Sequence, residues 1–543
     1  MAGRSDKADI VIVGAGPVGL TLALVLAHQG VCSTLIEMRP EDAPAHPKCN
    51  TVSARSMEIF RRFGIAGEIR KMGLPADHPC DVVYATRYTR NELGRLPIPS
   101  WSERFGSKGH DAGWPTDEPP HRVSQLFLEP VLRRKAASTP GIDIRYDTEL
   151  LTLERAGDAV ILHMRDVKSG VEGTVEARYI IGCDGGRSQV RREIGVTLQG
   201  DDDLGRIKSV FLRSKELKWK ETLSPAWMTW VINAEQPGTV VALDGGELFL
   251  CHCRVPAGVS FDEFDAAQGV RDVMGTDFEF EMLAAENWTA RRLVAETYRK
   301  GRVFLAGDAA HIWLPMGGFG MNAGIEDADD LGWRLAGVVQ GWAPESLLDS
   351  YETERRPVGD QVSRAALQFA QTQQSVEIPE AMEADTEEGR QLRELVGTVM
   401  VERDGAQFNP VGLNFGIPYE ASPVIAYDGS VPPVFAIDAY EPSTVPGCRA
   451  PYVKLADGSS LYDRLHKGFT LLRLDPSLDV TAMEEVVAKR GVPFAVLDIS
   501  GKEVRALYDF PLALVRPDQR IAWRGKVVPD ACVELIDKLR GAA

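Results

Sequence analysis

Residues 10–19 read Ile-Val-Ile-Val-Gly-Ala-Gly-Pro-Val-Gly. The four β-branched residues at the start are typical of a buried parallel strand. Gly14 permits a tight turn, Gly16 lets the backbone approach a pyrophosphate, and Gly19 lets the next helix pack close to the strand. The stretch therefore predicts a strand, a glycine-rich turn and a helix from about Pro17 to Gln29.

A carboxylate follows at the place that a dinucleotide site requires. Residues 31–36 predict a second strand, and Glu37 ends it. A carboxylate there can accept hydrogen bonds from both hydroxyl groups of an adenosine ribose, while the free N–H groups of the helix face the phosphates. An ordinary βαβ unit with incidental glycines would not require Glu37. We therefore predict a dinucleotide site that includes Gly14, Gly16, Pro17, Gly19 and Glu37.

Length and charge narrow the class of protein. The chain has 543 residues, sufficient for two or three domains, and a net charge of −17 without a basic tail. This charge argues against nucleic acid and anionic membranes as partners. Arg4 and Lys7 precede an apolar run, as in a secretory signal. However, the glycines, the proline and the lack of a cleavage pattern fit neither a signal nor a spanning helix.

The eight cysteines are scattered and form neither a Cys-x-x-Cys motif nor a Cys/His metal spacing. Cys251-His252-Cys253 lies in an alternating, strand-like run, so the two thiols share one face while His252 points away. We interpret these residues as core or edge packing. We expect no metal, and we expect a cytoplasmic protein with reduced thiols.

Two more strands are expected to end in a glycine-flanked acid. Residues 174–181 lead into Gly-Cys-Asp-Gly-Gly, which contains Asp184. Residues 302–306 lead into Gly-Asp, which contains Asp308. An acid on such a strand-to-helix turn can lie near a nucleotide, although alone it is usually only a turn. His311 follows closely, and we interpret it as a structural hydrogen-bonding residue because the sequence shows no partner for it.

A glycine-rich loop, residues 315–322, precedes a long predicted helix over 323–340. A loop so poor in side chains, at a helix N-terminus, suits a planar ligand on which negative charge develops.

The pattern of apolar and polar residues divides the remaining chain into a predicted sheet, an irregular segment, two helices and a linker. Residues 208–288 alternate and predict a second, mostly antiparallel sheet that could roof an apolar pocket. Residues 73–120 lack periodicity and are expected to wrap a ligand site or an interface. We predict a short helix over 347–357, a solvated acidic helix over 380–403 and a linker over 409–433.

With these three motifs in order, the sequence resembles the class A flavoprotein aromatic hydroxylases, the p-hydroxybenzoate hydroxylase superfamily. The resemblance covers about residues 8–360. The last hundred or so residues resemble the thioredoxin-like C-terminal domain of the longer members, such as phenol, chlorophenol and polyketide hydroxylases. Residues 514–518 favour that subgroup. The resemblance implies a cis Pro511, and the lack of a cysteine pair implies no redox role for this domain.

The implied fold is α/β, with a Rossmann-like FAD-binding domain, an inserted, mostly antiparallel β-sheet for the substrate, and the C-terminal thioredoxin-like domain. The expected boundaries are 1–200 and 291–408 for the FAD-binding domain and its helices, 201–290 for the substrate sheet, 409–440 for the linker and 441–543 for the C-terminal domain.

The resemblance also implies roles for single residues. The first motif and Glu37 bind the ADP half of FAD. Asp184 lies near FAD and the pyridine nucleotide, and Asp308 lies on the ribitol side. Lys48 stands where the family usually has an arginine on the pyrophosphate, and Arg55 is a second candidate. The further cofactor residues are Gln125 and, in the loop that supports the isoalloxazine, Pro315, Gly318, Gly320, Met321 and Asn322.

The implied reaction uses NADPH or NADH to reduce FAD, and O2 then forms a C4a-hydroperoxide that hydroxylates a phenolic or polycyclic aromatic substrate. The protein must exclude water and raise the electron density of the ring. No catalytic base can be named from the sequence. The family also implies a homodimer.

Three other functions use a similar fold. One is an epoxidase or Baeyer–Villiger-type tailoring enzyme, and another is a non-catalytic binding protein with an FAD fold. A halogenase is disfavoured because residues 226–232 do not reproduce the Gly-Trp-x-Trp-x-Ile-Pro stretch of that family.

Overall fold

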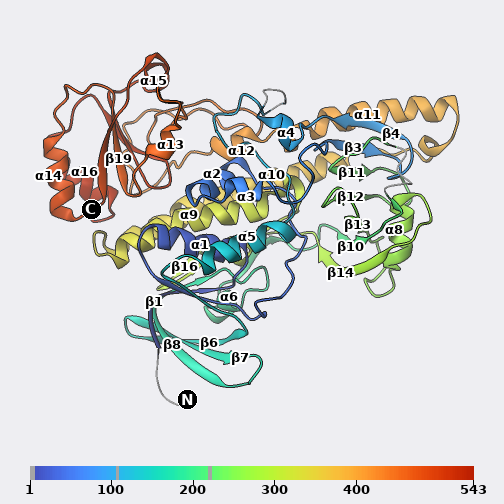
Figure 1. Cartoon of the computed structure of the whole chain (residues 1–543), viewed down its shortest axis with the longest axis horizontal. Helices are drawn as coiled ribbons and strands as arrows, with labels where there is room; N and C mark the ends of the chain where they lie inside the picture. Colours follow the sequence, from blue (N-terminus) through green and yellow to red (C-terminus); the bar gives the residue numbers. More distant parts are fainter. Residues whose placement is uncertain (1–5, 106–108, 110, 218–222) are drawn as a thin grey trace.

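The computed structural model describes residues 6–105, 109, 111–217 and 223–543 (Figure 1). In Figure 1 a C-terminal module and a large, mostly antiparallel sheet lie at opposite ends of the molecule, with α1, α5 and α9 between them. No helix in the described ranges is long and apolar enough to cross a membrane.

The first sheet contains the predicted βαβ unit. Its strands run in the order β16-β17-β8-β1-β2-β5, and a β6–β7 hairpin is attached through β8. Because β1 pairs in parallel with β2 and β8, and β17 pairs in parallel with β8, the carboxyl ends of these strands meet at one edge. The bounds are β1 (Asp6–Val13), β2 (Ser33–Ile36), β5 (Ile142–Arg145), β6 (Thr148–Ala156), β7 (Ala159–Asp166), β8 (Glu172–Gly182), β16 (Arg299–Lys300) and β17 (Val303–Leu305).

Helices follow the strands of this sheet and pack against it. The helix after the first glycine turn is confirmed, as is the long helix after the glycine-rich loop. Ser53 caps the next helix through its side chain, as expected for a serine before an apolar run. The bounds are α1 (Pro17–His28), α2 (Ala54–Arg62), α3 (Ala66–Ile69), α5 (Gln125–Ala137), α6 (Gln189–Glu193) and α9 (Phe319–Val339).

The second sheet has the strand order β14-β10-β13-β12-β11-β3-β4. The alternation in residues 208–288 correctly predicted most of it. Residues 73–120, which showed no periodicity, also supply β3 and β4 to this sheet, and β3 pairs in parallel with β11. Four buried residues are too short a run to show periodicity. The bounds are β3 (Val82–Ala85), β4 (Glu92–Leu96), β10 (Arg206–Arg213), β11 (Met228–Val231), β12 (Gly238–Ala242), β13 (Leu248–Arg254) and β14 (Glu281–Thr289).

The helices around the second sheet are longer or more buried than predicted. α10 (Asp349–Gln374) continues through Pro357, where the sequence predicted an end. α11 (Glu387–Phe408) buries Val396 and Met400, and its Gly397 lies so close to β4 that a Cβ atom would be 1.8 Å from the Leu93 carbonyl oxygen. Two shorter helices are α4 (Trp101–Arg104) and α8 (Ala266–Met274). A small sheet of β9 (Leu198–Asp201), β15 (Arg292–Ala295) and β18 (His311–Ile312) completes this part.

The C-terminal module has the predicted thioredoxin-like arrangement. Its sheet has the order β20-β19-β21-β22, in which β19 is parallel to β20 and antiparallel to β21. The implied cis Pro511 is wrong, because no peptide bond in the described ranges is cis. A proline before a strand does not determine its isomer, which tertiary packing sets. The bounds are β19 (Phe469–Arg473), α14 (Thr481–Arg490), β20 (Phe494–Asp498), α15 (Lys502–Leu507), β21 (Leu512–Val515), β22 (Ile521–Gly525) and α16 (Cys532–Leu539), preceded by α12 (Val411–Phe415) and α13 (Leu461–Arg464).

Candidate functional site

The three glycines of the first turn are required for different reasons. Gly14 has φ +104°, and a Cβ atom there would lie 2.5 Å from the Cys183 carbonyl oxygen. A Cβ atom at Gly19 would lie 2.0 Å from the Gly14 carbonyl oxygen. A Cβ atom at Gly16 would meet nothing within 4 Å. Thus the fold itself requires Gly14 and Gly19, whereas Gly16 keeps open the space before α1, whose N-terminus has no side-chain cap. This arrangement fits an anionic phosphate group.

Glu37 lies beside this turn and is buried. One carboxylate oxygen accepts a hydrogen bond from the Ala15 N–H at 2.8 Å, and the other accepts two from Arg39 at 3.1 Å. The oxygen that accepts from Ala15 can accept a further bond, so the carboxylate is oriented but not saturated. Sequence reasoning missed Arg39, which also lies 3.3 Å from Glu129. The Gln125 amide donates to the same Glu129 at 3.0 Å, so Gln125 and Glu37 are joined through a single network.

The second motif lies against the first. Asp184 accepts hydrogen bonds from the Ser188 hydroxyl at 2.6 Å and from the backbone N–H groups of Gln189 and Val190 at 2.6 and 3.1 Å. Its carboxylate therefore caps α6, and burial raises its pKa. Arg191 from the same helix donates to the Ala309 carbonyl oxygen at 3.0 Å, which ties the second motif to the third.

Asp308 combines exposure with a desolvated environment. Its side chain is exposed and forms no hydrogen bond with another residue in the part of the chain that the structure describes. Nevertheless, desolvation raises its pKa, which the charges of His311 and Lys48 partly oppose. This combination is typical of a carboxylate in a recess. Lys48 is itself exposed. The hydrogen bond with His46 and, to a smaller extent, the charge of Lys48 lower the pKa of Glu286 on β14.

The third motif is held by a buried carboxylate that the sequence did not reveal. Asp327 on α9 accepts hydrogen bonds from the Gly307 N–H at 3.1 Å, from His311 Nε2 at 2.7 Å and from Arg355 Nε at 2.8 Å. Burial raises its pKa, but Arg355 and His311 outweigh this and bring the pKa to about 2. The structural interpretation of His311 is therefore confirmed. The sequence feature that could have identified Asp327 is its position as an acid on the apolar face of a predicted helix.

The glycine-rich loop leaves a helix N-terminus open. Gly317 and Gly318 have φ +67° and +69°, in the left-handed region that favours glycine. α9 begins at Phe319 with Gly318 as its N-cap and with no side-chain cap. The first N–H groups of the helix therefore lack intrahelical acceptors. Gly320 and Met321 are half-buried and Pro315 is exposed, so this loop is accessible.

The Asn322 side chain forms hydrogen bonds only within the protein, at the glycine-rich loop and the segment before α2. It donates to the Thr51 and Gly318 carbonyl oxygens at 3.1 and 2.7 Å, and it accepts from the Ser53 N–H and the Ser56 hydroxyl, each at 2.8 Å. All four contacts are internal, so the side chain joins the start of α9 to the segment before α2. Only backbone groups near Met321 and Asn322 remain available for a ligand.

Arg55, the second candidate for the pyrophosphate, is engaged in contacts within the protein. It is buried and forms ion pairs with Asp329 at 3.1 Å and Glu58 at 3.2 Å. It also donates to Gln519 of the C-terminal module at 2.5 Å. Its charge therefore joins α2, α9 and the C-terminal module.

Sequence reasoning also missed Arg122, which brings a positive charge next to the glycine-rich loop. It is buried and donates to the Thr51 hydroxyl at 2.6 Å, and its guanidinium lies 4.4 Å from the centre of the Trp227 ring. No carboxylate of a described residue lies within ion-pair distance, and burial lowers the pKa of Arg122 to about 10. A Cβ atom at Gly318 would lie 2.2 Å from the Thr51 side chain, so this charge is one residue away from the loop.

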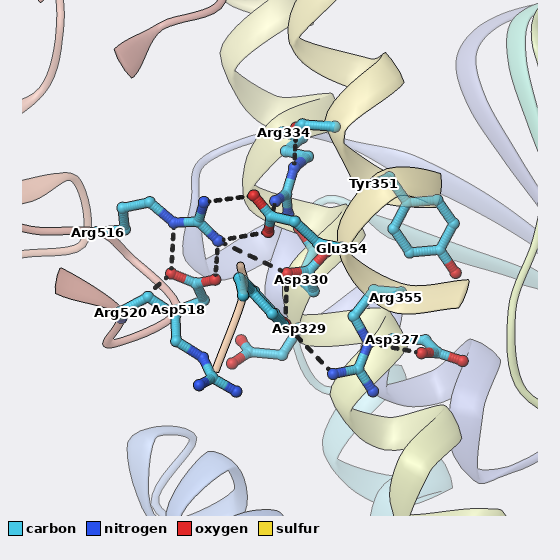
Figure 2. A network of polar contacts seen from close by, with 12 residues as sticks. Asp327, Asp329, Asp330, Arg334, Tyr351, Glu354, Arg355, Arg516, Asp518 and Arg520 are labelled. Carbon is cyan, nitrogen blue, oxygen red and sulfur yellow. Dashed lines mark hydrogen bonds and ion pairs between the residues drawn. The ribbon is translucent and has the colours of Figure 1, made fainter. Parts of the chain in front are cut away.

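A buried ion network connects α9 and α10 to the C-terminal module (Figure 2). Arg516 binds both oxygens of Glu354 at 2.7 Å, and Glu354 also pairs with Arg334. The oxygens of Asp330, Glu354 and Asp518 lie within 4.8 Å of one another, as in a metal site. Because each carboxylate already faces an arginine, we interpret the cluster as an ion-pair network.

Asp308 allows a direct test of the recess. Replacing it with alanine is expected to weaken cofactor binding by about tenfold, which is about 1.4 kcal/mol, because the side chain has no structural partner to lose. Cofactor titration by fluorescence would measure this, and the thermal stability of the unloaded protein should not change. Asp158→Ala, at a fully exposed carboxylate, is the matched control. Equal affinities for the two variants would remove Asp308 from the site.

The chain matches two families of known proteins. The family described as "FAD binding domain" matches residues 7–366, and "Aromatic-ring hydroxylase, C-terminal" matches residues 443–543. The chain is 30% identical to 4-methyl-5-nitrocatechol 5-monooxygenase from Burkholderia sp, over 98% of this chain and 97% of that protein.

Solved structures match over the whole length. The rebeccamycin biosynthetic enzyme RebC with reduced flavin is 34% identical, with a TM-score of 0.90 over 99% of this chain and 100% of that one. Aklavinone-11 hydroxylase, solved with FAD and aklavinone, is 25% identical, with a TM-score of 0.83 over 99% of each chain.

Proposed function

Because this chain belongs to the aromatic-ring hydroxylase family of FAD-dependent monooxygenases, we propose that it hydroxylates a phenolic or polycyclic aromatic substrate with NAD(P)H and O2. One structural observation carries the proposal. The three cofactor motifs meet at one sheet edge, and the second sheet is linked to that edge through the pair of His46 and Glu286, 2.9 Å apart. The relatives named for a nitrocatechol and for aklavinone support the substrate class.

The residues present fit FAD. The open space at Gly16, the uncapped starts of α1 and α9, and the oriented Glu37 carboxylate suit its phosphates, ribose and ring system. We assign Lys48 to the pyrophosphate and Asp308 to the ribitol. When bound, FAD supplies the oxygen-transfer chemistry, and the chain orients the substrate and excludes water.

We propose that cofactor binding and substrate binding are divided between the domains at the expected boundaries. Residues 1–200 and 291–408 hold FAD, and residues 201–290 with β3 and β4 hold the substrate. Half-buried aromatic side chains of the second sheet support this, among them Trp230 and Trp288, which pack against a cluster that includes Met316 and Phe319 of the glycine-rich loop. Residues 409–440 connect to the C-terminal module, residues 441–543.

The test is NAD(P)H oxidation by FAD-loaded protein with ¹⁸O2 and a panel of phenols, nitrocatechols and hydroxyanthraquinones. The expected result is oxidation stimulated by one class, with a single labelled oxygen in a new ring hydroxyl. Running NADH and NADPH in parallel determines the preferred donor. Label in an epoxide or a lactone would favour the tailoring alternatives. Bound FAD without stimulation by any member would contradict the proposal.

A further inference from the structure

His252 lies on the face of the second sheet that is opposite to α8. It is on β13 between Cys251 and Cys253, whose buried sulfur atoms lie 3.7 Å apart on the opposite face. α8 covers that opposite face, since a Cβ atom at Gly269 would lie 3.6 Å from the Cys253 Cβ atom. Because side chains alternate along a strand, His252 points away from α8.

Strand register places His252 in a row of side chains that crosses the sheet. On one side, Ser209 of β10 is its direct neighbour, followed by Glu286 of β14. On the other side the row continues through Thr239, Trp230 and Tyr84. These residues share one face, and the pairing of Glu286 with His46 shows which way this face looks. His46 lies in the loop that carries Lys48, so the face looks toward the cofactor motifs.

The hydrogen bonds of His252 leave one nitrogen available. Nδ1 lies 2.8 Å from the Ser209 hydroxyl oxygen, and Nε2 forms no hydrogen bond with another residue in the described ranges. The side chain is only half-buried, yet desolvation lowers its pKa to about 4. Asp308 shows the same combination of access and desolvation. The neutral form of His252 is therefore favoured at pH 7, and its Nε2 has no hydrogen-bond partner among the described residues.

The charges around this position are few. Ser209 and Thr239, on the two flanking strands, are uncharged. Glu286 is two strands away in the same row, and Arg254 is two residues along β13 on the same face. His46 and Lys48 lie beyond Glu286 in the loop. When Nδ1 holds the ring proton, Nε2 of this neutral imidazole can accept a hydrogen bond from a ligand hydroxyl.

We propose that Nε2 of His252 accepts a hydrogen bond from the ring hydroxyl of the substrate and takes its proton during oxygen transfer, while Ser209 positions the imidazole through Nδ1. This rests on the proposed function. Phenols are weak acids, but the hydroxyl becomes strongly acidic as the ring gives up electron density to the incoming oxygen. The free lone pair of Nε2 is available to take this proton as the hydroxyl becomes acidic.

The bonds, protons and electrons of this step are balanced within the overall hydroxylation reaction of the family. The O–H bond of the substrate breaks and an N–H bond forms on Nε2, while the electron pair moves into the ring as the new C–O bond forms. The ring carbon then loses its hydrogen to restore aromaticity, and the first oxygen regains a proton. NAD(P)H supplies two electrons, and one oxygen atom of O2 leaves as water. The proton held by His252 enters that water, which returns the imidazole to its neutral form.

The decisive variant is His252→Gln, which keeps a hydrogen-bonding group but cannot take a proton. With the best substrate of the panel, kcat at pH 7 is expected to fall by about 10²–10³-fold. The loss should shrink as the pH rises through the ionisation of the substrate itself, because an ionised phenol needs no base. FAD affinity, followed by flavin fluorescence, should be unchanged.

Two further variants separate this role from a structural one. His163→Gln makes the same change at an exposed position on β7 and should leave kcat and its pH profile unchanged. Ser209→Ala should lower kcat at pH 7 by about tenfold, which corresponds to about 1.4 kcal/mol, and should show the same recovery at high pH.

Other results would overturn the proposal. An unchanged pH profile in His252→Gln, or an equal loss at every pH, would show that His252 takes no proton. If the unmodified protein hydroxylates no member of the panel, the proposed function fails, and this proposal fails with it. Hydroxylation by the unmodified protein with a normal His252→Gln variant would leave the proposed function intact and remove only the role of His252.

Discussion

Replacing Arg516 with methionine is expected to lower the free energy of unfolding by about 3–5 kcal/mol, because buried carboxylates lose their counter-charge. The Arg516 and Glu354 side chains have no exposure, and Asp518 is almost as buried. Arg516 donates to both oxygens of Glu354 at 2.7 Å and to Asp518 at 3.0 Å. Its charge helps to lower the pKa of both carboxyl groups, against the effect of burial. Without it, the charge of Glu354 is balanced by Arg334 alone.

Urea unfolding of the FAD-loaded protein would measure this difference. Arg490→Met is the matched control, because Arg490 pairs with Asp537 at 2.6 Å on the surface, where such a pair contributes about 0–1 kcal/mol. Since protonation of Glu354 and Asp518 removes the negative charge that Arg516 balances, the deficit of Arg516→Met should be smaller at acidic pH. Similar losses in the two variants would mean that the network in Figure 2 does not stabilise the contact between α10 and the C-terminal module.

Replacing Gly16 with valine is expected to weaken FAD binding by at least about 100-fold, or about 2.7 kcal/mol. Apart from its two chain neighbours, no described residue has an atom within 4 Å of a Cβ atom at Gly16. The new side chain would therefore occupy the space before the N–H groups of α1 without disturbing the fold. Equilibrium binding of FAD and thermal unfolding of the unloaded protein would be measured together. We expect a large change in the first and little change in the second.

Two other glycines show whether the effect is specific. Gly19→Val should destabilise even the unloaded protein, because its Cβ atom would lie 2.0 Å from the Gly14 carbonyl oxygen. Gly67→Val on α3 is the surface control, with nothing within 4 Å, and should leave FAD affinity unchanged. Normal FAD affinity in Gly16→Val would contradict the assignment of this space to the cofactor.

Local patterns were sufficient for the parts of the fold in which neighbouring residues act together. The β-branched run before Gly14, the glycine turn and the helix after it depend on contacts within about thirty residues, and all three were predicted. The alternation in residues 208–288 predicted most of the second sheet, because burial of one face repeats every two residues. The thioredoxin-like module was implied by resemblance, and its strand order agrees.

By itself, then, the sequence determined the βαβ unit, the three motifs and the family. Only the tertiary structure revealed that Asp327 holds His311, that Arg55 and Arg516 join the C-terminal module to α2, α9 and α10, and that β3 pairs with β11. It also placed His252 and Ser209 together on the face that looks toward the cofactor motifs. These partners come from distant parts of the chain, and a pairing of single charges or short strands leaves no periodic signal in the sequence around either partner.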